Sequence, residues 1–225
     1  VFTDAFWKMG ESPIRFCCMY GGEDYDGRIA VRQRKFSCPD FAEDASWEPA
    51  VQVQPPDGKL IASPIAPVRV MKKYCPVSVR KTGENTWLYD FGTNFSGWAR
   101  IYINKNSAPA GSKIIMTPGE IIDDSFVPDQ RVTGKGYACT YLISDESEQE
   151  FAPVPDLEKN KGNMPVIEKI VGEFIYPDVE QTGEFHCSKP LFNDIHKIIC
   201  QAILSNLKSY TTDCPHRERL PWLEQ

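Results

Sequence analysis

The sequence predicts a mainly β protein with one amphipathic helix near its C-terminal end. Through about the first 180 residues, short runs alternate apolar and polar side chains and are separated by Pro, Gly and Asn. This is the pattern of half-buried strands joined by turns, and strands this short and this frequent are typical of antiparallel β-sandwiches. After Cys187 the apolar spacing changes to three and four residues, which is the period of one helix face.

In the first third of the chain, strands are predicted at residues 29–34 and 68–71, where apolar and polar positions alternate. Residues 55–58 read Pro-Pro-Asp-Gly, which is a strong turn sequence. The Gly-flanked segment 21–27 carries three acidic residues that could hold calcium, but the twelve-residue EF-hand spacing is missing. A structural segment that holds a sandwich against its neighbour is the preferred interpretation.

The same alternation continues through the middle of the chain. It predicts further strands, which fall at residues 87–89, 99–103, 113–117 and 137–143. Residues 104–111 contain Asn, Ser, Pro and Gly and are predicted to be the loop between two of these strands.

The helix is predicted from its cap and its apolar stripe. Ser188 is a suitable N-cap residue, and Pro190 would then lie in the first turn. Apolar side chains follow on a single face: Leu191, Ile195, Ile198, Ile199, Ala202, Ile203 and Leu207. The pattern stops near Ser209 and Tyr210, so the helix is expected to end there.

Composition restricts the class of protein. The chain has 225 residues, of which 41% are hydrophobic and 12% aromatic, so it is globular and long enough for more than one core. Its net charge of −6 argues against nucleic acid or an anionic membrane as a partner. No apolar run approaches the ~20 residues that span a bilayer, and Val1 does not open a signal peptide.

Eight cysteines are scattered along the chain without C-x-x-C pairs or zinc spacing. Most of them are interpreted as small buried hydrophobes, and a disulfide framework is not expected. Neither a metal nor a cofactor is expected. Together with the missing signal peptide, this favours the cytoplasm over the periplasm.

The last fifteen residues carry the chemistry of greatest interest. Directly after the predicted helix come two carboxylates, Asp213 and Glu218. Arg217 lies between them, and Trp222 follows Glu218. A site that cleaves sugars needs a carboxylic acid to protonate the leaving oxygen, polar groups to hold hydroxyls, and an aromatic face to cover the ring. This segment supplies each of these.

Residues 213–222, Asp-Cys-Pro-His-Arg-Glu-Arg-Leu-Pro-Trp, resemble the entry to the catalytic domain of bacterial α-L-rhamnosidases, a family of inverting glycoside hydrolases. Three earlier blocks also resemble that family, in the family's order. Residues 20–28 look like its N-terminal sandwich signature, residues 89–98 like the start of its next sandwich, and residues 183–193 like the lead-in to its first catalytic helix.

The resemblance implies a domain organisation and an activity. Residues 1–75 and 76–180 would form two antiparallel, jelly-roll-like β-sandwich domains, and residues 181–225 would begin an α/α barrel cut off after Gln225. The family removes terminal rhamnose, so a rhamnose-containing glycoside or polysaccharide is the implied partner, and a homo-oligomer stays possible. The family's general base comes from later in the barrel, and the 225-residue chain alone is therefore expected to be inactive.

The resemblance also assigns roles to the site residues. Glu218 would be the general acid, Asp213 and Arg217 would hold sugar hydroxyls, and Trp222 would stack on the sugar. Each has a plainer alternative from the residues alone. Glu218 could form a surface salt bridge, Arg217 could pair with either carboxylate, Asp213 could be a turn residue, and Trp222 could belong to the core.

Two departures keep other functions open. Gln225 stands where the family usually has an acidic residue, which leaves room for a different sugar. The family closes its second sandwich with an aromatic strand, and none is found between Phe151 and Pro165. A non-catalytic carbohydrate-binding module that uses Trp87 and Trp98, or a purely structural role for the sandwiches, are the remaining hypotheses.

Overall fold

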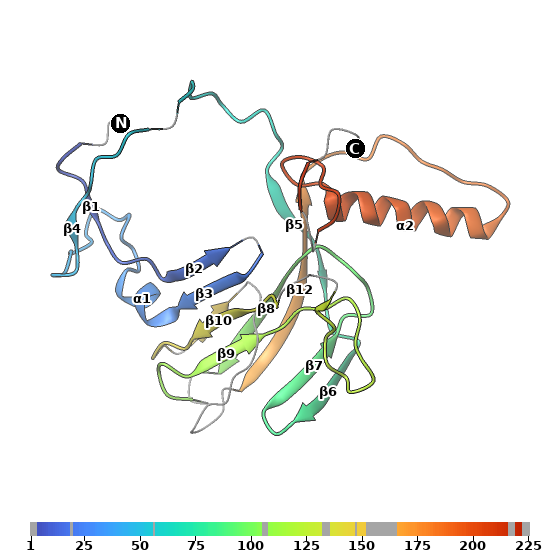
Figure 1. Cartoon of the computed structure of the whole chain (residues 1–225), viewed down its shortest axis with the longest axis horizontal. Coiled ribbons are helices and arrows are strands. Elements are labelled where there is room, and N and C mark those ends of the chain that lie inside the picture. Colours follow the sequence, from blue (N-terminus) through green and yellow to red (C-terminus); the bar gives the residue numbers. More distant parts are fainter. Residues whose placement is uncertain are drawn as a thin grey trace.

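The structure of the chain is a computed structural model that describes residues 4–18, 20–55, 57–104, 108–131, 136–146, 148–151, 166–215 and 219–221. Figure 1 shows most of the strands gathered in one body, a small pair of strands, β1 and β4, at its edge, and a long helix, α2, that projects on the opposite side. The elements are, in order, β1 (Lys8–Met9), β2 (Ile14–Cys18), β3 (Gly22–Asp26), α1 (Gly27–Arg32), β4 (Glu48–Pro49), β5 (Val68–Tyr74), β6 (Ser78–Gly83), β7 (Thr86–Asp90), β8 (Gly97–Asn104), β9 (Lys113–Met116), β10 (Cys139–Leu142), β11 (Glu148–Phe151), β12 (Ile167–Pro177) and α2 (Pro190–Asn206).

Among the described residues the strands form two four-stranded sheets, with the orders β2-β3-β10-β9 and β11-β8-β12-β5, and two small pairs, β1-β4 and β6-β7. The mainly β class with a helix after the sheets is confirmed. The strand pairs of the described chain are antiparallel except for β10 and β3, which run parallel. This parallel pair joins residues from the two predicted sandwich domains in one sheet. The boundaries at residues 75 and 180 stay a prediction.

The two four-stranded sheets share one hydrophobic core. Ile101, Ile103 and Ile170 come from β8 and β12, and they pack against residues that the other sheet contributes. Ile114 of β9 and Tyr141 of β10 are at most 4% exposed. Burial of these large side chains between facing sheets is what holds a sandwich together. The predicted strands at residues 68–71, 87–89 and 99–103 lie within β5, β7 and β8. Those at residues 113–117 and 137–143 are present but shorter than predicted, as β9 and β10.

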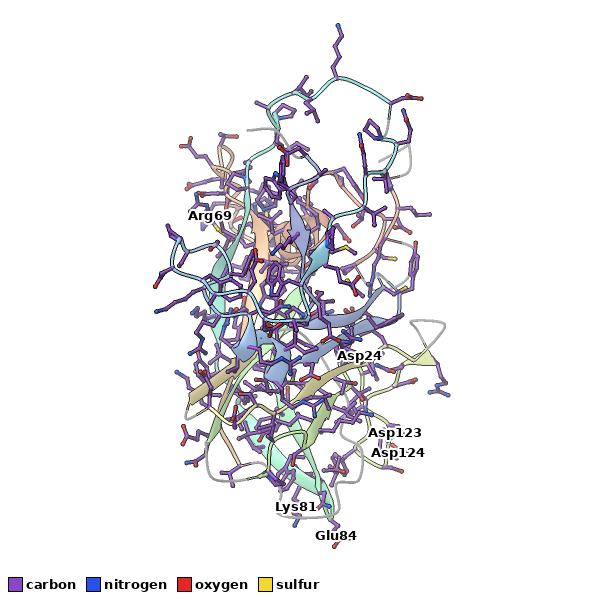
Figure 2. All side chains as sticks on the ribbon, turned by 90° about the vertical axis from the view of Figure 1, so that its left-hand side faces the viewer. Asp24, Arg69, Lys81, Glu84, Asp123 and Asp124 are labelled. Atoms are coloured by element: carbon purple, nitrogen blue, oxygen red, sulfur yellow. The ribbon has the colours of Figure 1, made fainter. Side chains whose placement is uncertain are left out.

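Charged side chains cover the outside of this body. Figure 2 shows Lys81 and Glu84 at the tip of the β6–β7 hairpin, with Asp123 and Asp124 in the loop that follows β9. All four are exposed. These charged positions at turns and loops are thus in contact with water.

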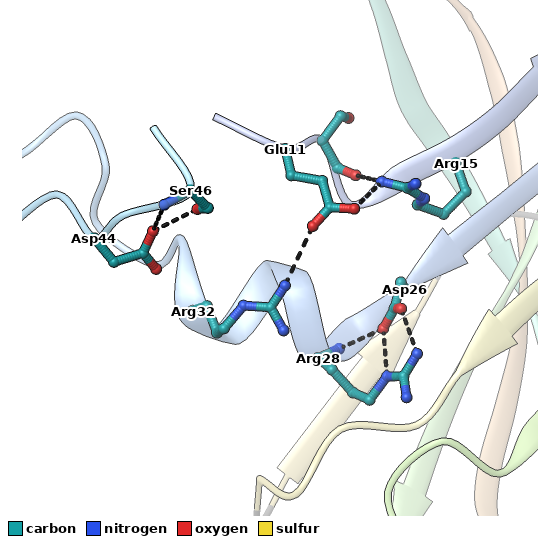
Figure 3. Close-up of polar contacts among 8 residues, drawn as sticks. Glu11, Arg15, Asp26, Arg28, Arg32, Asp44 and Ser46 are labelled. Carbon is teal, nitrogen blue, oxygen red and sulfur yellow. Dashed lines mark hydrogen bonds and ion pairs between the residues drawn. The ribbon is translucent and has the colours of Figure 1, made fainter. Parts of the chain in front are cut away.

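The predicted strand at residues 29–34 is wrong, because residues 27–32 form the short helix α1. Asp26 caps this helix by accepting a hydrogen bond from the backbone N–H of Arg28 at 3.0 Å. The Arg28 guanidinium also donates to both carboxylate oxygens, at 2.9 and 2.7 Å (Figure 3). These bonds lower the pKa of Asp26, so the cap stays charged. A capping carboxylate outweighs the weak strand signal of six residues.

Both ends of helix α2 differ from the prediction. The helix starts one residue later than a cap at Ser188 would place it, and it ends earlier than predicted. Lys189, not Ser188, is the N-cap residue, and Pro190 is the first helical residue. Asn193 secures the entry, since its side-chain amide accepts from the N–H of Cys187 and donates to its carbonyl. The helix stops at Asn206, three residues before Ser209. Nothing in the described structure buries its apolar stripe: Leu191, Ile195, Ile198, Ile199 and Ile203 are each at least 42% exposed.

The aromatic strand missing between residues 151 and 165 is supplied a few residues later by β12. Its sequence Gly172-Glu-Phe-Ile-Tyr176 lies between β8 and β5 in the centre of the second four-stranded sheet. Residues 152–165 lie outside the described residues, as does part of the predicted loop 104–111. In the described part of the chain, no helix is long and apolar enough to cross a membrane.

Gly22 explains why the Gly-flanked segment 21–27 has its composition. Its φ of +101° lies in the left-handed region, and a Cβ there would be 1.8 Å from the carbonyl oxygen of Ala138. Only glycine therefore lets β3 run this close to the residues that lead into β10. This fits the structural interpretation of the segment, since β3 forms the parallel pair with β10.

We expect Gly22→Ala to lower the free energy of unfolding by about 2–3 kcal/mol, because it adds both backbone strain and a steric clash. Gly58→Ala is the matched control. Gly58 also has a positive φ, +132°, but nothing lies within 4 Å of its added Cβ. Guanidinium unfolding of both variants separates the two causes. Equal losses in the two variants would show that the close approach to Ala138 costs nothing.

Candidate functional site

The candidate site is built where the chain reverses after α2. Thr212 is buried and makes this reversal, since its N–H donates to the carbonyl of Asn206 at 2.9 Å and its hydroxyl to the same oxygen at 3.1 Å. Leu207 and Thr211 pair across it as an isolated bridge. In Figure 1 this segment folds back from α2 onto the upper end of β12. The reversal places Asp213 beside the sandwich instead of along the helix axis.

Asp213 closes a loop. Its N–H donates to the carbonyl of Leu220 at 3.2 Å, and its Oδ1 accepts from the N–H of Leu220 at 3.1 Å. Its Oδ2 accepts from the Cys214 thiol at 3.6 Å. The turn-residue alternative for Asp213 therefore has a geometric basis. The sugar-binding role assigned by resemblance stays a prediction.

The other three predicted site residues lie outside the described residues. Arg217 and Glu218 belong to the loop that Asp213 and Leu220 close, and Trp222 follows that loop. The structure thus fixes the base of the loop, and the roles of these three side chains remain predictions.

Lys208 is a site-proximal residue that sequence reasoning missed. Its ammonium group donates to the carbonyl of Ile175 at 2.5 Å, and the N–H of Ile175 donates to Ser96 at 3.1 Å. Burial lowers the pKa of Lys208 to about 8. This bond ties the end of α2 to the end of β12. No local pattern marks it, because a lysine after a helix is ordinarily a solvated charge.

Arg219 and Tyr137 form a second tie between the loop and the sandwich. Arg219 adopts a left-handed backbone conformation with a φ of 55°, and its guanidinium carbon lies 5.0 Å from the centre of the Tyr137 ring. Burial raises the pKa of Tyr137 to about 12, while the positive charge of Arg219 opposes that rise. No sequence signal pointed to Tyr137 or to a contact between Arg219 and the sandwich.

A shallow, open pocket lies between these ties. Lys208, Arg219, Tyr210 and Thr212 contribute polar groups to its lining, and Ser96, Ser209 and Pro215 complete it. The Lys208 ammonium and the Thr212 hydroxyl in this lining already donate to backbone carbonyls, those of Ile175 and Asn206. Within the described residues, no group of three or more His, Cys, Asp or Glu side chains could hold a metal ion. The eight cysteines form no disulfide, but only Cys139 is buried, so the expectation that most of them are small buried hydrophobes is wrong.

Glu173 is a buried carboxylate at the centre of β12 that does not qualify as a catalytic acid. Its side chain is 1% exposed and accepts from Arg100 at 2.9 and 2.8 Å and from the Trp98 indole at 2.7 Å. Lys73 lies 3.3 Å away. Donation from Arg100 and these neighbours lowers the pKa of Glu173 to about 2. It is therefore ionised at neutral pH and has no proton to give.

The same network bears on the carbohydrate-module hypothesis. The indole N–H of Trp98 is already used by Glu173, and Trp98 is only partly exposed. Trp87 is also partly buried, with the Lys81 ammonium 5.4 Å from its ring centre. Both rings are thus engaged within the protein, which gives the sandwich-platform hypothesis no support from the described structure.

Comparison with known proteins gives a consistent result. Residues 1–72 match the α-L-rhamnosidase N-terminal domain, residues 80–158 the bacterial α-L-rhamnosidase concanavalin-like domain, and residues 180–225 the bacterial α-L-rhamnosidase six-hairpin glycosidase domain. A sandwich region that leads into a six-hairpin glycosidase domain defines the class as glycoside hydrolases of that architecture. Within this class, the chain belongs to the α-L-rhamnosidase family.

Individual relatives agree with this assignment. Curated α-L-rhamnosidases from Formosa agariphila and Alteromonas sp. are 27% and 25% identical over 99% of the chain, and the chain spans about a quarter of their length. The solved α-L-rhamnosidase of Dictyoglumus thermophilum superimposes with a TM-score of 0.85 at 32% identity, over 99% of this chain and 26% of that one. The Aspergillus terreus enzyme gives 0.81 at 26% identity, with the same coverage of both chains. A Streptomyces avermitilis α-L-rhamnosidase solved with L-rhamnose, at 21% identity and a TM-score of 0.78, shares the fold.

Proposed function

We propose that the chain is part of a longer inverting glycoside hydrolase that removes terminal α-L-rhamnose from glycosides. The observation that carries this proposal is the match of residues 180–225 to a six-hairpin glycosidase domain, because that stretch contains the whole predicted site segment. Two curated relatives along nearly the full chain are named α-L-rhamnosidases, and a related structure was solved with L-rhamnose. These names support rhamnose as the sugar.

The proposed mechanism assigns one task to each site residue. Glu218 protonates the glycosidic oxygen as the bond to the anomeric carbon breaks, and a carboxylate from elsewhere in the barrel deprotonates the attacking water. In inverting enzymes these two groups stand about 6.5–9.5 Å apart, which leaves room for the water. Asp213 and Arg217 hold hydroxyls, and Trp222 covers the apolar face of the sugar.

The described structure supports this mechanism through the base of the loop. The paired bonds between Asp213 and Leu220 hold together the two ends of the stretch that carries Arg217 and Glu218. Fixing the ends of a short loop reduces the conformations it samples, so an acid on it needs less reorganisation to reach the glycosidic oxygen. Arg219 adds an anchor between that loop and the sandwich, and Lys208 ties the end of α2, which precedes the loop, to β12.

The proposal predicts that the full-length protein hydrolyses an aryl α-L-rhamnoside and that the isolated 225-residue chain does not, because the base is supplied from outside it. Product analysis by proton NMR should show the β-anomer first, as inversion requires. Aryl glycosides of other sugars serve as controls. Faster hydrolysis of another sugar's aryl glycoside would contradict the assignment of rhamnose as the substrate. Turnover by the purified 225-residue chain would contradict the expectation that the general base lies outside it.

A further inference from the structure

The contact between Tyr137 and Arg219 joins two segments that are far apart in the sequence. Tyr137 lies directly before β10, in the sheet with the order β2-β3-β10-β9, whereas Arg219 lies in the loop that follows α2. The 5.0 Å between the guanidinium carbon and the ring centre is within the range of a cation–π interaction. A strand-end residue of the sandwich therefore holds a residue of the candidate site.

Tyr137 is itself firmly held. Its N–H donates to the Gln130 side-chain oxygen at 3.0 Å, and its carbonyl accepts from the Gln130 side-chain nitrogen at 2.6 Å. The same nitrogen donates to the carbonyl of Pro118 at 3.0 Å. Two reciprocal bonds and partial burial give the ring a defined place. Because its pKa is raised to about 12, the ring is neutral throughout the range in which an enzyme is assayed.

Arg219 connects the Tyr137 ring to the base of the loop. It directly precedes Leu220, whose N–H and carbonyl are the two groups that bind Asp213. The left-handed conformation of Arg219 sets the direction in which the chain enters Leu220. Consecutive Cα atoms are only about 3.8 Å apart, so a side chain that fixes Arg219 also restricts the residues on either side of it.

We propose that Tyr137 is a positioning residue for the loop closed by Asp213 and Leu220, and that it acts through the guanidinium of Arg219. This proposal rests on the proposed function only for its kinetic consequence. Its structural content is that a sandwich side chain orders the loop, and this can be measured without any substrate.

The test replaces Tyr137 in the full-length protein in two ways. Tyr137→Leu removes the ring, and Tyr137→Phe keeps it. Hydrogen exchange followed by mass spectrometry should show faster exchange of the peptide that contains residues 213–220 in the Leu variant, and wild-type exchange in the Phe variant. With an aryl rhamnoside, the Leu variant should lose about 10-fold in kcat, while the Phe variant stays within about twofold of wild type.

A double-mutant cycle with Arg219→Met decides whether the effect passes through Arg219. The single variants should show similar losses, and the double variant should lose little more than either, because both remove the same contact. Arg219→Met also leaves the sandwich side untouched, so it tests the contact even if Tyr137→Leu folds poorly. Tyr102→Leu is the matched control, since Tyr102 faces Lys169 in a similar pair on β8. It should leave loop exchange and kcat unchanged.

Several outcomes would overturn the inference. Unchanged exchange of residues 213–220 in Tyr137→Leu would show that the ring does not order the loop, whatever the enzyme acts on. Additive losses in the cycle would show that Tyr137 and Arg219 act independently. A wild-type protein with no activity on rhamnosides but with faster loop exchange in Tyr137→Leu would overturn the proposed function and leave the positioning role supported.

Discussion

Replacing Glu218 by Gln in the full-length protein is expected to lower kcat for an aryl α-L-rhamnoside by about 10²–10⁴. Glutamine has nearly the same shape as glutamic acid but no proton to transfer to the leaving oxygen. The interactions that bind the sugar would be retained, so KM should change much less than kcat. Steady-state kinetics of the wild type and the variant give both numbers.

The dependence on the leaving group identifies the role. A phenol with a low pKa leaves without protonation, so the loss should be smallest for such substrates and largest for alkyl or sugar aglycones. Glu184→Gln is the matched control, because Glu184 is an exposed carboxylate that lies before α2. Wild-type activity in Glu218→Gln would show that another residue is the general acid. Glu218 would then be assigned to a surface salt bridge.

Replacing Glu173 by Gln is expected to lower the free energy of unfolding by about 3–5 kcal/mol, because one partner of a buried ion pair is removed. The Arg100 guanidinium, which is 24% exposed, and the Trp98 indole would lose their charged acceptor, because the glutamine amide offers them one neutral oxygen in place of two charged ones. Guanidinium unfolding followed by tryptophan fluorescence measures the change. Glu184→Gln again serves as the control and should have almost no effect.

The same carboxylate predicts an acid-sensitive part of the stability. The pKa of Glu173 in the folded chain, about 2, lies below the ordinary value of 4.5. Its contribution is therefore fully present above the ordinary value and is lost as the pH falls from there toward 2. The contribution to the free energy of unfolding that is lost over this pH range is on the order of 3 kcal/mol. Wild type should approach the variant's stability near pH 2, and a constant difference between them from pH 7 to pH 2 would contradict this assignment.

Local patterns were sufficient for five of the twelve strands and for helix α2 among the described elements. The strands β5, β7, β8, β9 and β10 were predictable because alternation of side chains across a sheet is written in consecutive residues. Helix α2 was predictable from its apolar spacing, although its cap was misplaced by one residue and its end by three. The motif at residues 213–222 pointed to the family, which the three domain matches confirm.

Other features depend on which residues meet in space. Residues 27–32 form α1 where a strand was predicted, because Asp26 caps the helix by accepting a hydrogen bond from the N–H of Arg28. The charge of Glu173 is tolerated in the middle of β12 only because Arg100 and Trp98 reach it from the neighbouring strand.

At the candidate site, the sequence by itself determined the residue types and their order, since Asp213, Arg217, Glu218 and Trp222 follow one another within ten positions. The tertiary structure decided how the loop is held: by Leu220 on Asp213, and by Tyr137 on Arg219. A ring contact between residues 137 and 219 leaves no trace in either local sequence. The contact stabilises the loop only after the sheets have packed and the two side chains have come within reach of each other.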